Sequence, residues 1–140
     1  MSDKKAAWED DHWCYVCGDR NPEGMKLRFE TKGREIETCY RAEKRHQGYR
    51  DVLHGGFLAM LMDEVMVHLP YRVLGTWSVT AEMNVRLIKP VPTGEKVRVR
   101  AFFLDGDGTE KSRLFRIGAE CSLQDGTVVA RAEGKCVRVS

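Results

Sequence analysis

One stretch, DVLHGGFLAMLMDEVMVHLP at residues 51–70, constrains the fold more than any other part of the chain. Between Phe57 and Leu69 it has the composition of a helix that is apolar on nearly every side, and such a helix must be buried. Yet Asp63 and Glu64 stand in its middle. Burying an ionised carboxylate is costly unless a nearby group compensates the charge. These two acids are therefore the first candidates for function.

Local signals give this helix a start and an end. Gly55 and Gly56 open it. We expect it to stop at Leu69, because the residue before Pro70 is pushed out of helical geometry.

Strand patterns occupy most of the remaining chain. Two strands are predicted before the helix, at residues 27–31 and 35–42, with a tight turn at Lys32-Gly33 between them and a loop at residues 43–53 after them. Four strands follow the helix, within residues 76–90, 95–104, 113–123 and 128–139. Turn signals stand at DGDG (105–108) and QDGT (124–127). The first of the four alternates, which places Trp77, Val79, Ala81, Met83, Val85 and Leu87 on one face.

These elements predict an α+β fold in which a long antiparallel sheet wraps around one central apolar helix. A helix packed flat on an open sheet is the alternative, but it leaves more of that helix in water. At 140 residues the chain is expected to form a single domain, residues 1–140, in which residues 1–24 are a turn-rich N-terminal segment.

Composition narrows the class of function. Lys and Arg number 23 against 21 Asp and Glu, without a basic block, which argues against a nucleic-acid partner. We expect neither a signal peptide nor a membrane-spanning segment, because no apolar run is long enough. A cytoplasmic protein is therefore predicted, in which the five cysteines stay reduced.

The helix start and Asp63 suggest acyl chemistry. Gly55 and Gly56 place unpaired N–H groups at the positive end of the helix dipole, where an oxygen that becomes anionic during acyl transfer can bind. Asp63 stands about two turns further along, where it could meet a ligand that lies along the helix or reaches across from an adjoining subunit. A partly desolvated carboxylate is a competent general base. Together these groups are a minimal set for hydrolysing an activated acyl group.

Several motifs resemble one family. HGGFLAMLMDE (54–64) and SVTAEMNVRLIKPVPTGEKV (78–97), with CYVCGDRNPEGMKLRF (14–29) and HQGY (46–49) upstream, resemble the hotdog-fold acyl-CoA thioesterases of the phenylacetate-pathway and aromatic-CoA type. The likeness spans about residues 14–138. It implies a hotdog fold that hydrolyses acyl-CoA to free acid and CoA, with no cofactor other than the CoA of the substrate.

The resemblance also implies roles for individual residues. Asp63 falls at the family's catalytic acid, which acts as base on water or as nucleophile. Gly55 falls where a backbone N–H polarises the thioester carbonyl, with Gly56 close by. His54 matches a residue that lines the same spot.

Two further residues and two departures complete this comparison. Thr80 matches a hydroxyl that positions water in some relatives, and Gln47 lies in the loop where other branches place Asn or Gln near the carbonyl. Arg50 departs from the proline of many relatives. Glu64 directly follows the expected acid, and successive helix residues diverge by roughly 100°, so both acids cannot face one ligand. The spacing favours Asp63, which leaves Glu64 for an ion pair or a dimer contact.

Ligand, partner and metal predictions follow from the same residues. Arg86, Lys89 and Arg72 are the candidates for contacts with CoA. A homodimer is predicted, with a homotetramer as a larger alternative, because the sheet leaves an edge for which the strand within 76–90 is the candidate. Cys14-x-x-Cys17, with His12 two residues earlier, is half of a zinc pattern. No second pair exists, because Cys39, Cys121 and Cys136 are isolated on predicted strands, so no metal is predicted.

Two rival functions share the fold. A non-catalytic acyl-CoA sensor or interaction module is the rival of another class, because a fold hosts many functions. A hotdog dehydratase is disfavoured, since no catalytic histidine partner is evident.

Overall fold

The computed structural model describes residues 8–104 and 108–139. Its elements in chain order are β1 (Glu30–Lys32), β2 (Glu35–Arg41), a short 3-10 helix η1 (Lys44–His46), α1 (Gly55–Leu74), β3 (Ser78–Leu87), β4 (Lys96–Phe103), β5 (Leu114–Leu123) and β6 (Val128–Arg138). All strand pairs are antiparallel, and the six strands lie in the order β1-β2-β4-β5-β6-β3. None of the helices in these residues is long and apolar enough to cross a membrane.

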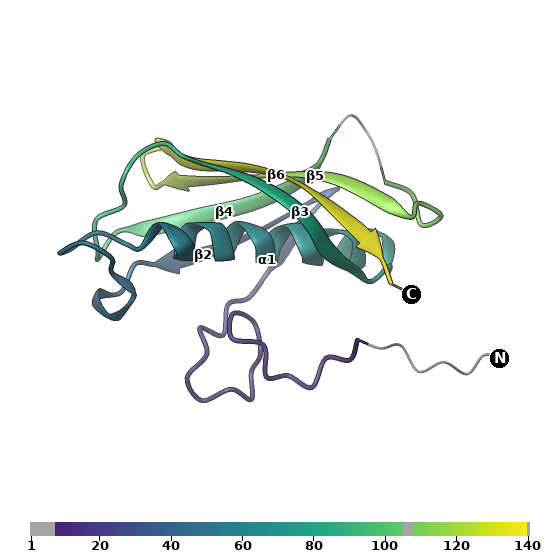
Figure 1. The fold of residues 1–140 in the computed structure, drawn as a ribbon, viewed down its shortest axis with the longest axis horizontal. Helices are drawn as coiled ribbons and strands as arrows, with labels where there is room; N and C mark the ends of the chain where they lie inside the picture. Colours follow the sequence, from purple (N-terminus) through teal and green to yellow (C-terminus); the bar gives the residue numbers. More distant parts are fainter. Residues whose placement is uncertain (1–7, 105–107, 140) are drawn as a thin grey trace.

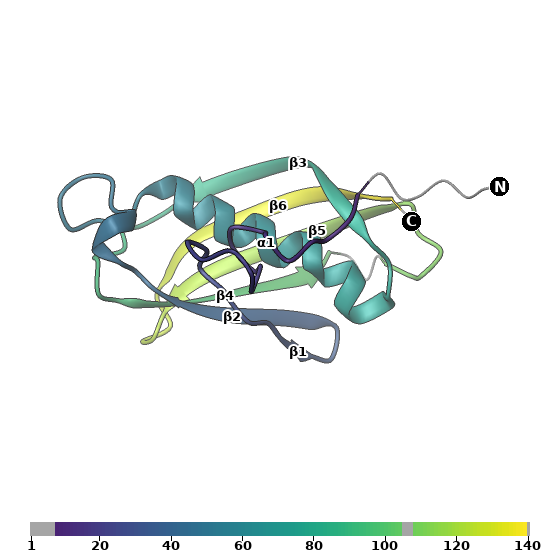
Figure 2. The same cartoon turned by 90° about the horizontal axis from the view of Figure 1, so that it is seen from below.

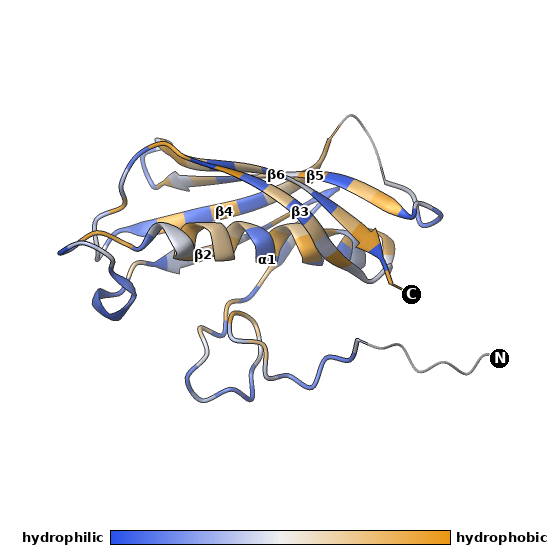
Figure 3. Ribbon diagram, in the orientation of Figure 1, coloured by the Kyte–Doolittle hydropathy of each residue, from blue (hydrophilic) through white to orange (hydrophobic). Residues whose placement is uncertain are grey.

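The core lies between α1 and the sheet, which curves over the helix (Figure 1). Apolar and polar residues alternate along β4, β5 and β6, so that one face of each strand is apolar (Figure 3). From the helix, Leu61, Met62, Val65, Met66 and Leu69 are completely buried against this face. The predicted α+β fold, one long antiparallel sheet around a central helix, is confirmed.

The N-terminal segment covers the other side of α1. Viewed from below, residues 8–29 cross the helix on the side that the sheet leaves open (Figure 2). Residues 8–24 contain no helix or strand, as expected of a turn-rich segment, and residues 1–7 lie outside the described part. The helix is therefore buried by two different partners.

The helix does not stop where the sequence predicts. α1 continues beyond Pro70 to Leu74, and Gly75, whose left-handed φ is 71°, caps the last turn. A proline inside a helix leaves the carbonyl four residues earlier without its N–H donor. That carbonyl belongs to Met66, and the Cys136 thiol from β6 donates to it (Sγ–O 3.9 Å). A tertiary contact thus replaces a lost helical bond, so the expected end at Leu69 is wrong.

The predicted single apolar face of β3 is also wrong in its first half. The pairing of β3 with β6 shifts register between Thr80 and Glu82, which makes Ala81 the extra residue of a β-bulge. Thr80 faces Cys136 before the bulge, and Met83 faces the core after it, whereas Trp77 and Ala81 are exposed.

The remaining boundaries differ little from the predicted ones. β1 begins at Glu30, three residues later than expected, and Gly33 forms the predicted turn with a φ of 61°. The predicted loop at 43–53 contains η1. Residues 105–107 of the DGDG turn lie outside the described residues.

Candidate active site

Asp63 faces the inner side of the sheet near the bulge of β3. Its Oδ1 atom is buried and has no hydrogen-bond partner among the described residues. Burial and the negative charge of Asp63 raise the pKa of the Cys136 thiol to about 11, so the carboxylate lies within electrostatic range of that thiol. The Thr80 hydroxyl lies on the same thiol (Oγ1–Sγ 3.9 Å). Asp63 and Thr80 thus both act on the Cys136 thiol, the first through its charge and the second through a hydrogen-bond contact.

Glu64 faces the opposite partner, the N-terminal segment. Its Oε2 lies 2.9 Å from His68 Nε2 in an ion pair one helical turn apart, and the Cys14 thiol donates to the same oxygen (3.4 Å). Burial raises the pKa of Glu64, but hydrogen bonds from His68 and Cys17 outweigh burial and hold it below its ordinary value. Glu64 is thus a satisfied, structural acid in this chain.

The start of α1 offers one free backbone donor. His54 is the N-cap, and its Nδ1 accepts the N–H of Gly56 (2.8 Å). The N–H of Gly55 has no partner among the described residues. A Cβ on Gly55 would lie 2.7 Å from Leu87 Cδ1, so glycine permits a close approach here. Gly55, rather than Gly56, presents an available donor.

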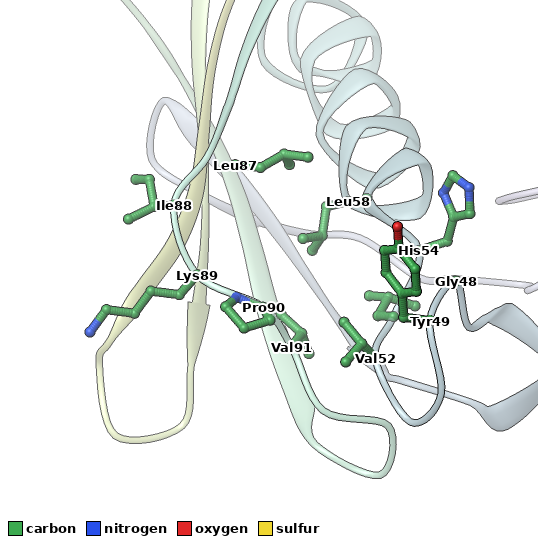
Figure 4. A pocket seen from close by; sticks show the side chains of 12 residues that line it. Gly48, Tyr49, Val52, His54, Leu58, Leu87, Ile88, Lys89, Pro90 and Val91 are labelled. Carbon is green, nitrogen blue, oxygen red and sulfur yellow. The ribbon is translucent and has the colours of Figure 1, made fainter.

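This donor opens onto a cavity of about 610 Å³ between the first turn of α1 and the loop that follows β3 (Figure 4). Its walls are mainly apolar and include Tyr49, Val52, Leu58, Leu87, Ile88 and Val91. His54 and Gly55 stand on the helix side, and Lys89 extends away from the helix on the other side. An apolar hollow with few polar groups is typical of a small-molecule site.

Three predicted site residues lie elsewhere in the chain. The Gln47 side-chain oxygen accepts the Asp51 N–H (2.9 Å) and so holds its own loop together. Arg72 lies over the Phe29 ring near the far end of α1 (5.4 Å). Arg86 lines a separate hollow on the outer face of the sheet, with Arg131 and others. Of the three basic residues expected to contact CoA, only Lys89 stands at the cavity of one chain.

One chain also leaves Asp63 apart from Gly55. They are eight residues apart on α1, which corresponds to roughly 12 Å along the helix axis. A base and an oxyanion donor that serve one carbonyl group must each come within about 3 Å of the reacting atoms. The geometry therefore requires a second copy of the chain, or another position for one role.

Sequence reasoning missed a second constellation. The ligand atoms of Cys14, Cys17 and Glu64 lie within 4.8 Å of one another, and His68 adjoins them. The spacing of Glu64 and His68, four residues apart in a helix, was the available signal. The sequence has no second closely spaced pair of cysteines, and the fold supplies the acid and the imidazole from α1 instead.

Comparisons with known proteins identify similar sequences and folds. Residues 51–106, which include α1, β3 and β4, match the thioesterase superfamily. No curated protein matches this sequence. A solved thioesterase superfamily protein is 23% identical, with a TM-score of 0.76 over 96% of this chain and 68% of its own.

Two further solved structures are similar. The Escherichia coli PaaI protein from the phenylacetic acid degradation operon is 15% identical, with a TM-score of 0.72 over 81% of this chain and 80% of its own. A hypothetical thioesterase of Streptococcus pneumoniae with coenzyme A is 14% identical, with a TM-score of 0.72 over 81% and 89%. Together, the superfamily match and the shared fold confirm the predicted resemblance of this chain to the hotdog-fold thioesterases.

Proposed function

We propose that this protein hydrolyses acyl-CoA thioesters to the free acid and CoA. The observation that carries the proposal is the buried Asp63 oxygen without a hydrogen-bond partner among the described residues. The charge of Asp63 raises the pKa of the Cys136 thiol, which the Thr80 hydroxyl contacts. Two structural neighbours support the substrate class: one from Streptococcus mutans is bound to acetyl CoA, and one from Streptococcus pneumoniae holds coenzyme A.

Gly55 would stabilise the developing negative charge. The thioester carbonyl oxygen accepts the free N–H of Gly55 and gains charge when its carbon is attacked. The positive end of α1 lies behind this N–H and favours the same charge. The acyl chain would occupy the apolar cavity, and Lys89 would contact the CoA phosphates.

Asp63 would supply the attack by one of two routes. As a base, it takes a proton from water, the water oxygen bonds to the acyl carbon, and the departing CoA sulfur recovers the proton as the C–S bond breaks. As a nucleophile, its oxygen bonds to the acyl carbon and expels CoA, and water then cleaves the anhydride. In the first route the Thr80 hydroxyl orients the water.

A homodimer would unite the two halves of the site. β3 is an edge of the sheet, and its end carries exposed apolar side chains, with Leu87 54% and Ile88 39% exposed. Asp63 lies near Thr80 at one end of β3, whereas Gly55 lies against Leu87 at the other. Antiparallel pairing of two β3 strands about a two-fold axis would bring Asp63 toward the partner's Gly55. A dimer of dimers is compatible with the same pairing.

The direct test measures CoA release. Purified protein is incubated with a panel of acyl-CoA esters, and free CoA is quantified by chromatography, because the protein's own thiols react with colorimetric reagents. We expect hydrolysis by the wild-type chain and its loss in Asp63→Ala. Esters that bind without being cleaved would replace the proposal with the non-catalytic sensor.

A mixed dimer tests the shared site. Gly55→Pro removes the free N–H, and proline is tolerated at the first helical position, where His54 already has a compatible ψ of 132°. Gly55→Ala is the matched control, because it adds a Cβ and keeps the N–H. Dimers of one Gly55→Pro chain and one Asp63→Asn chain, isolated with two tags, should regain about half of wild-type turnover, since one of two sites is then intact. Light scattering that shows a monomer at all dilutions, or a mixed dimer without activity, would contradict the shared site.

A further inference from the structure

Four side chains that the proposed chemistry does not use meet between α1 and the N-terminal segment. Cys14 and Cys17 come from the segment, and Glu64 and His68 stand one turn apart on α1. Cys14 Sγ lies 3.4 Å from Glu64 Oε2, and Cys17 Sγ lies 3.5 Å from His68 Nε2. The carboxylate and imidazole atoms are 2.9 Å apart. Two thiols, an imidazole and a carboxylate therefore converge.

We propose that these four side chains bind one zinc ion, which fastens the N-terminal segment to α1. Sulfur, imidazole nitrogen and carboxylate oxygen are the ligands that zinc takes in proteins, and four protein ligands make a closed, structural site. The second ligand pair that the sequence of the segment lacks is supplied by the helix.

Three of the ligand-atom distances are close to those around a tetrahedral ion. Bonds of about 2.3 Å to sulfur and 2.0–2.2 Å to nitrogen and oxygen place neighbouring ligand atoms roughly 3.4–3.8 Å apart. The two contacts that involve sulfur already have this spacing. The atoms of Glu64 and His68 would separate by about half an ångström, which small side-chain rotations provide. Cys14, Cys17 and Glu64 already lie within 4.8 Å of one another, and His68 completes the set after a side-chain rotation that brings it closer to all three.

The loop that carries the cysteines is preorganised. The Cys17 N–H points at Cys14 Sγ (3.5 Å), and the Gly18 N–H donates to the Cys14 carbonyl (2.8 Å). A Cβ at Gly18 would lie 2.4 Å from the Cys14 nitrogen, so only glycine fits the turn. An N–H directed at sulfur favours the thiolate, which is the form of cysteine that binds metal. This turn holds both sulfurs in place before any ion arrives.

Charge favours a cation at this point. The Glu64 side chain is only 11% exposed and the His68 side chain 19%. Among the described residues, the Glu64 carboxylate is hydrogen-bonded to one imidazole and to the cysteine thiols, so of these partners only His68 can carry a positive charge that offsets it. Zinc binding releases the thiol protons and places two positive charges among three negative groups. A buried acidic cluster would thereby be compensated.

The site would anchor a segment that has few other fastenings. Residues 8–29 contain no helix or strand, and their other contacts with α1 include the stacking of Phe29 on His68 (4.8 Å) and Arg72 over Phe29. Glu64, His68 and Arg72 recur every four residues, so the segment follows one stripe of the helix. Asp63 lies off this stripe. Zinc is therefore structural and takes no part in the attack on the thioester.

The first experiment counts the metal. Protein purified under reducing conditions is loaded with zinc and dialysed, and its zinc content is measured by inductively coupled plasma mass spectrometry. We expect one zinc per wild-type chain and none in Cys14→Ser/Cys17→Ser or His68→Ala. Cys39→Ser is the matched control, because Cys39 is exposed on β2, and it should keep its zinc. Cobalt in place of zinc should give a thiolate-to-metal charge-transfer band that weakens in each single cysteine variant.

The second experiment measures anchoring. Trypsin should cut after Arg20 and Lys26 faster once a chelator has removed zinc, and added zinc should restore protection. Reduced wild-type protein that takes up no zinc would overturn the proposal, as would uptake that survives in the double cysteine variant. So would a Cys14–Cys17 disulfide that persists under the same reducing conditions, seen as the loss of two hydrogens. Metal content decides these outcomes whether or not thioesters are hydrolysed.

Discussion

Asp63 and Glu64 are neighbours in the sequence, but α1 turns them into opposite environments. Asp63 faces β3 and β6, and one of its oxygens is buried without a partner. Glu64 faces the N-terminal segment, where His68 and Cys14 satisfy its carboxylate. A buried acceptor without a partner costs free energy, whereas a paired one contributes stability. The same chemical group in one helix is therefore unsatisfied on one side and satisfied on the other, which fits the different roles proposed for the two acids.

The largest predicted effect separates the two acids by activity. Asp63→Asn keeps the size of the side chain and removes its charge, so kcat should fall on the order of a hundredfold to ten-thousandfold. Folding should remain intact, and thermal stability should stay level or rise, because functional sites trade stability for activity. Circular dichroism and CoA release measure both. Glu64→Gln is the matched control and should cost far less turnover.

The opposite result would break the comparison. Turnover that survives Asp63→Asn and disappears in Glu64→Gln would show that the chemistry takes place on the Glu64 side of α1. Equal losses in both variants, with unchanged circular dichroism, would mean that the helix carries two cooperating acids.

Periodicity predicted the order of elements but not their tertiary exceptions. The alternation of β4, β5 and β6 and the apolar run of α1 were sufficient to predict which faces meet. The end of α1 was mispredicted because the Met66 carbonyl finds its donor on Cys136, seventy positions away. The bulge at Ala81 is equally non-local, since it exists only in the pairing of β3 with β6.

The sequence predicts those parts of the candidate site whose residues lie close together in the chain, and not those that distant segments bring together. Asp63 and Gly55 follow from spacing within one helix, and Lys89 from its place before the Pro-x-Pro turn. In one chain Arg72 contacts Phe29 from a distant segment, so its predicted contact with CoA stays a prediction. The catalytic roles of Asp63 and Gly55 stay predictions.

The second predicted effect concerns stability, for which Glu64 is expected to matter more than Asp63. With a chelator present, Glu64→Gln should lower the free energy of unfolding by roughly 1–3 kcal/mol, because His68 and Cys14 lose a charged acceptor in a buried place. Asp63→Asn should not lower it. Urea unfolding of both variants measures the difference. A Glu64→Gln chain as stable as wild type would show that its contacts are energetically neutral.

The third prediction concerns Thr80 on β3, whose hydroxyl is proposed to orient water for Asp63. Thr80→Val removes a hydroxyl at nearly constant shape and should lower kcat about tenfold, the value of one hydrogen bond that orients water. Thr80→Ser keeps the hydroxyl and should retain most of the turnover. Steady-state kinetics of the two variants decide the matter. Full activity in Thr80→Val would remove Thr80 from the site and leave Asp63 to position water alone.

The smallest predicted effect concerns charge at the surface. Lys89 stands at the cavity, whereas Arg72 belongs to the stripe of α1 that faces the N-terminal segment. Lys89→Met should raise the KM for an acyl-CoA roughly two- to fivefold at low salt, as expected of one exposed ion pair with phosphate. The difference should shrink at high salt, because ions screen such contacts.

Arg72→Met is the control that connects this effect to the two sides of the helix. In one chain Arg72 lies near the far end of α1, so its loss should leave KM unchanged at every ionic strength. An equal rise of KM in Arg72→Met would mean that CoA reaches the Glu64 side, through a second subunit that places this arginine at the partner's cavity. If the wild-type KM does not change with ionic strength, neither Lys89 nor Arg72 contacts the CoA phosphates. The dependence of KM on salt in the two variants therefore shows whether the CoA phosphates bind on the Asp63 side or on the Glu64 side of α1.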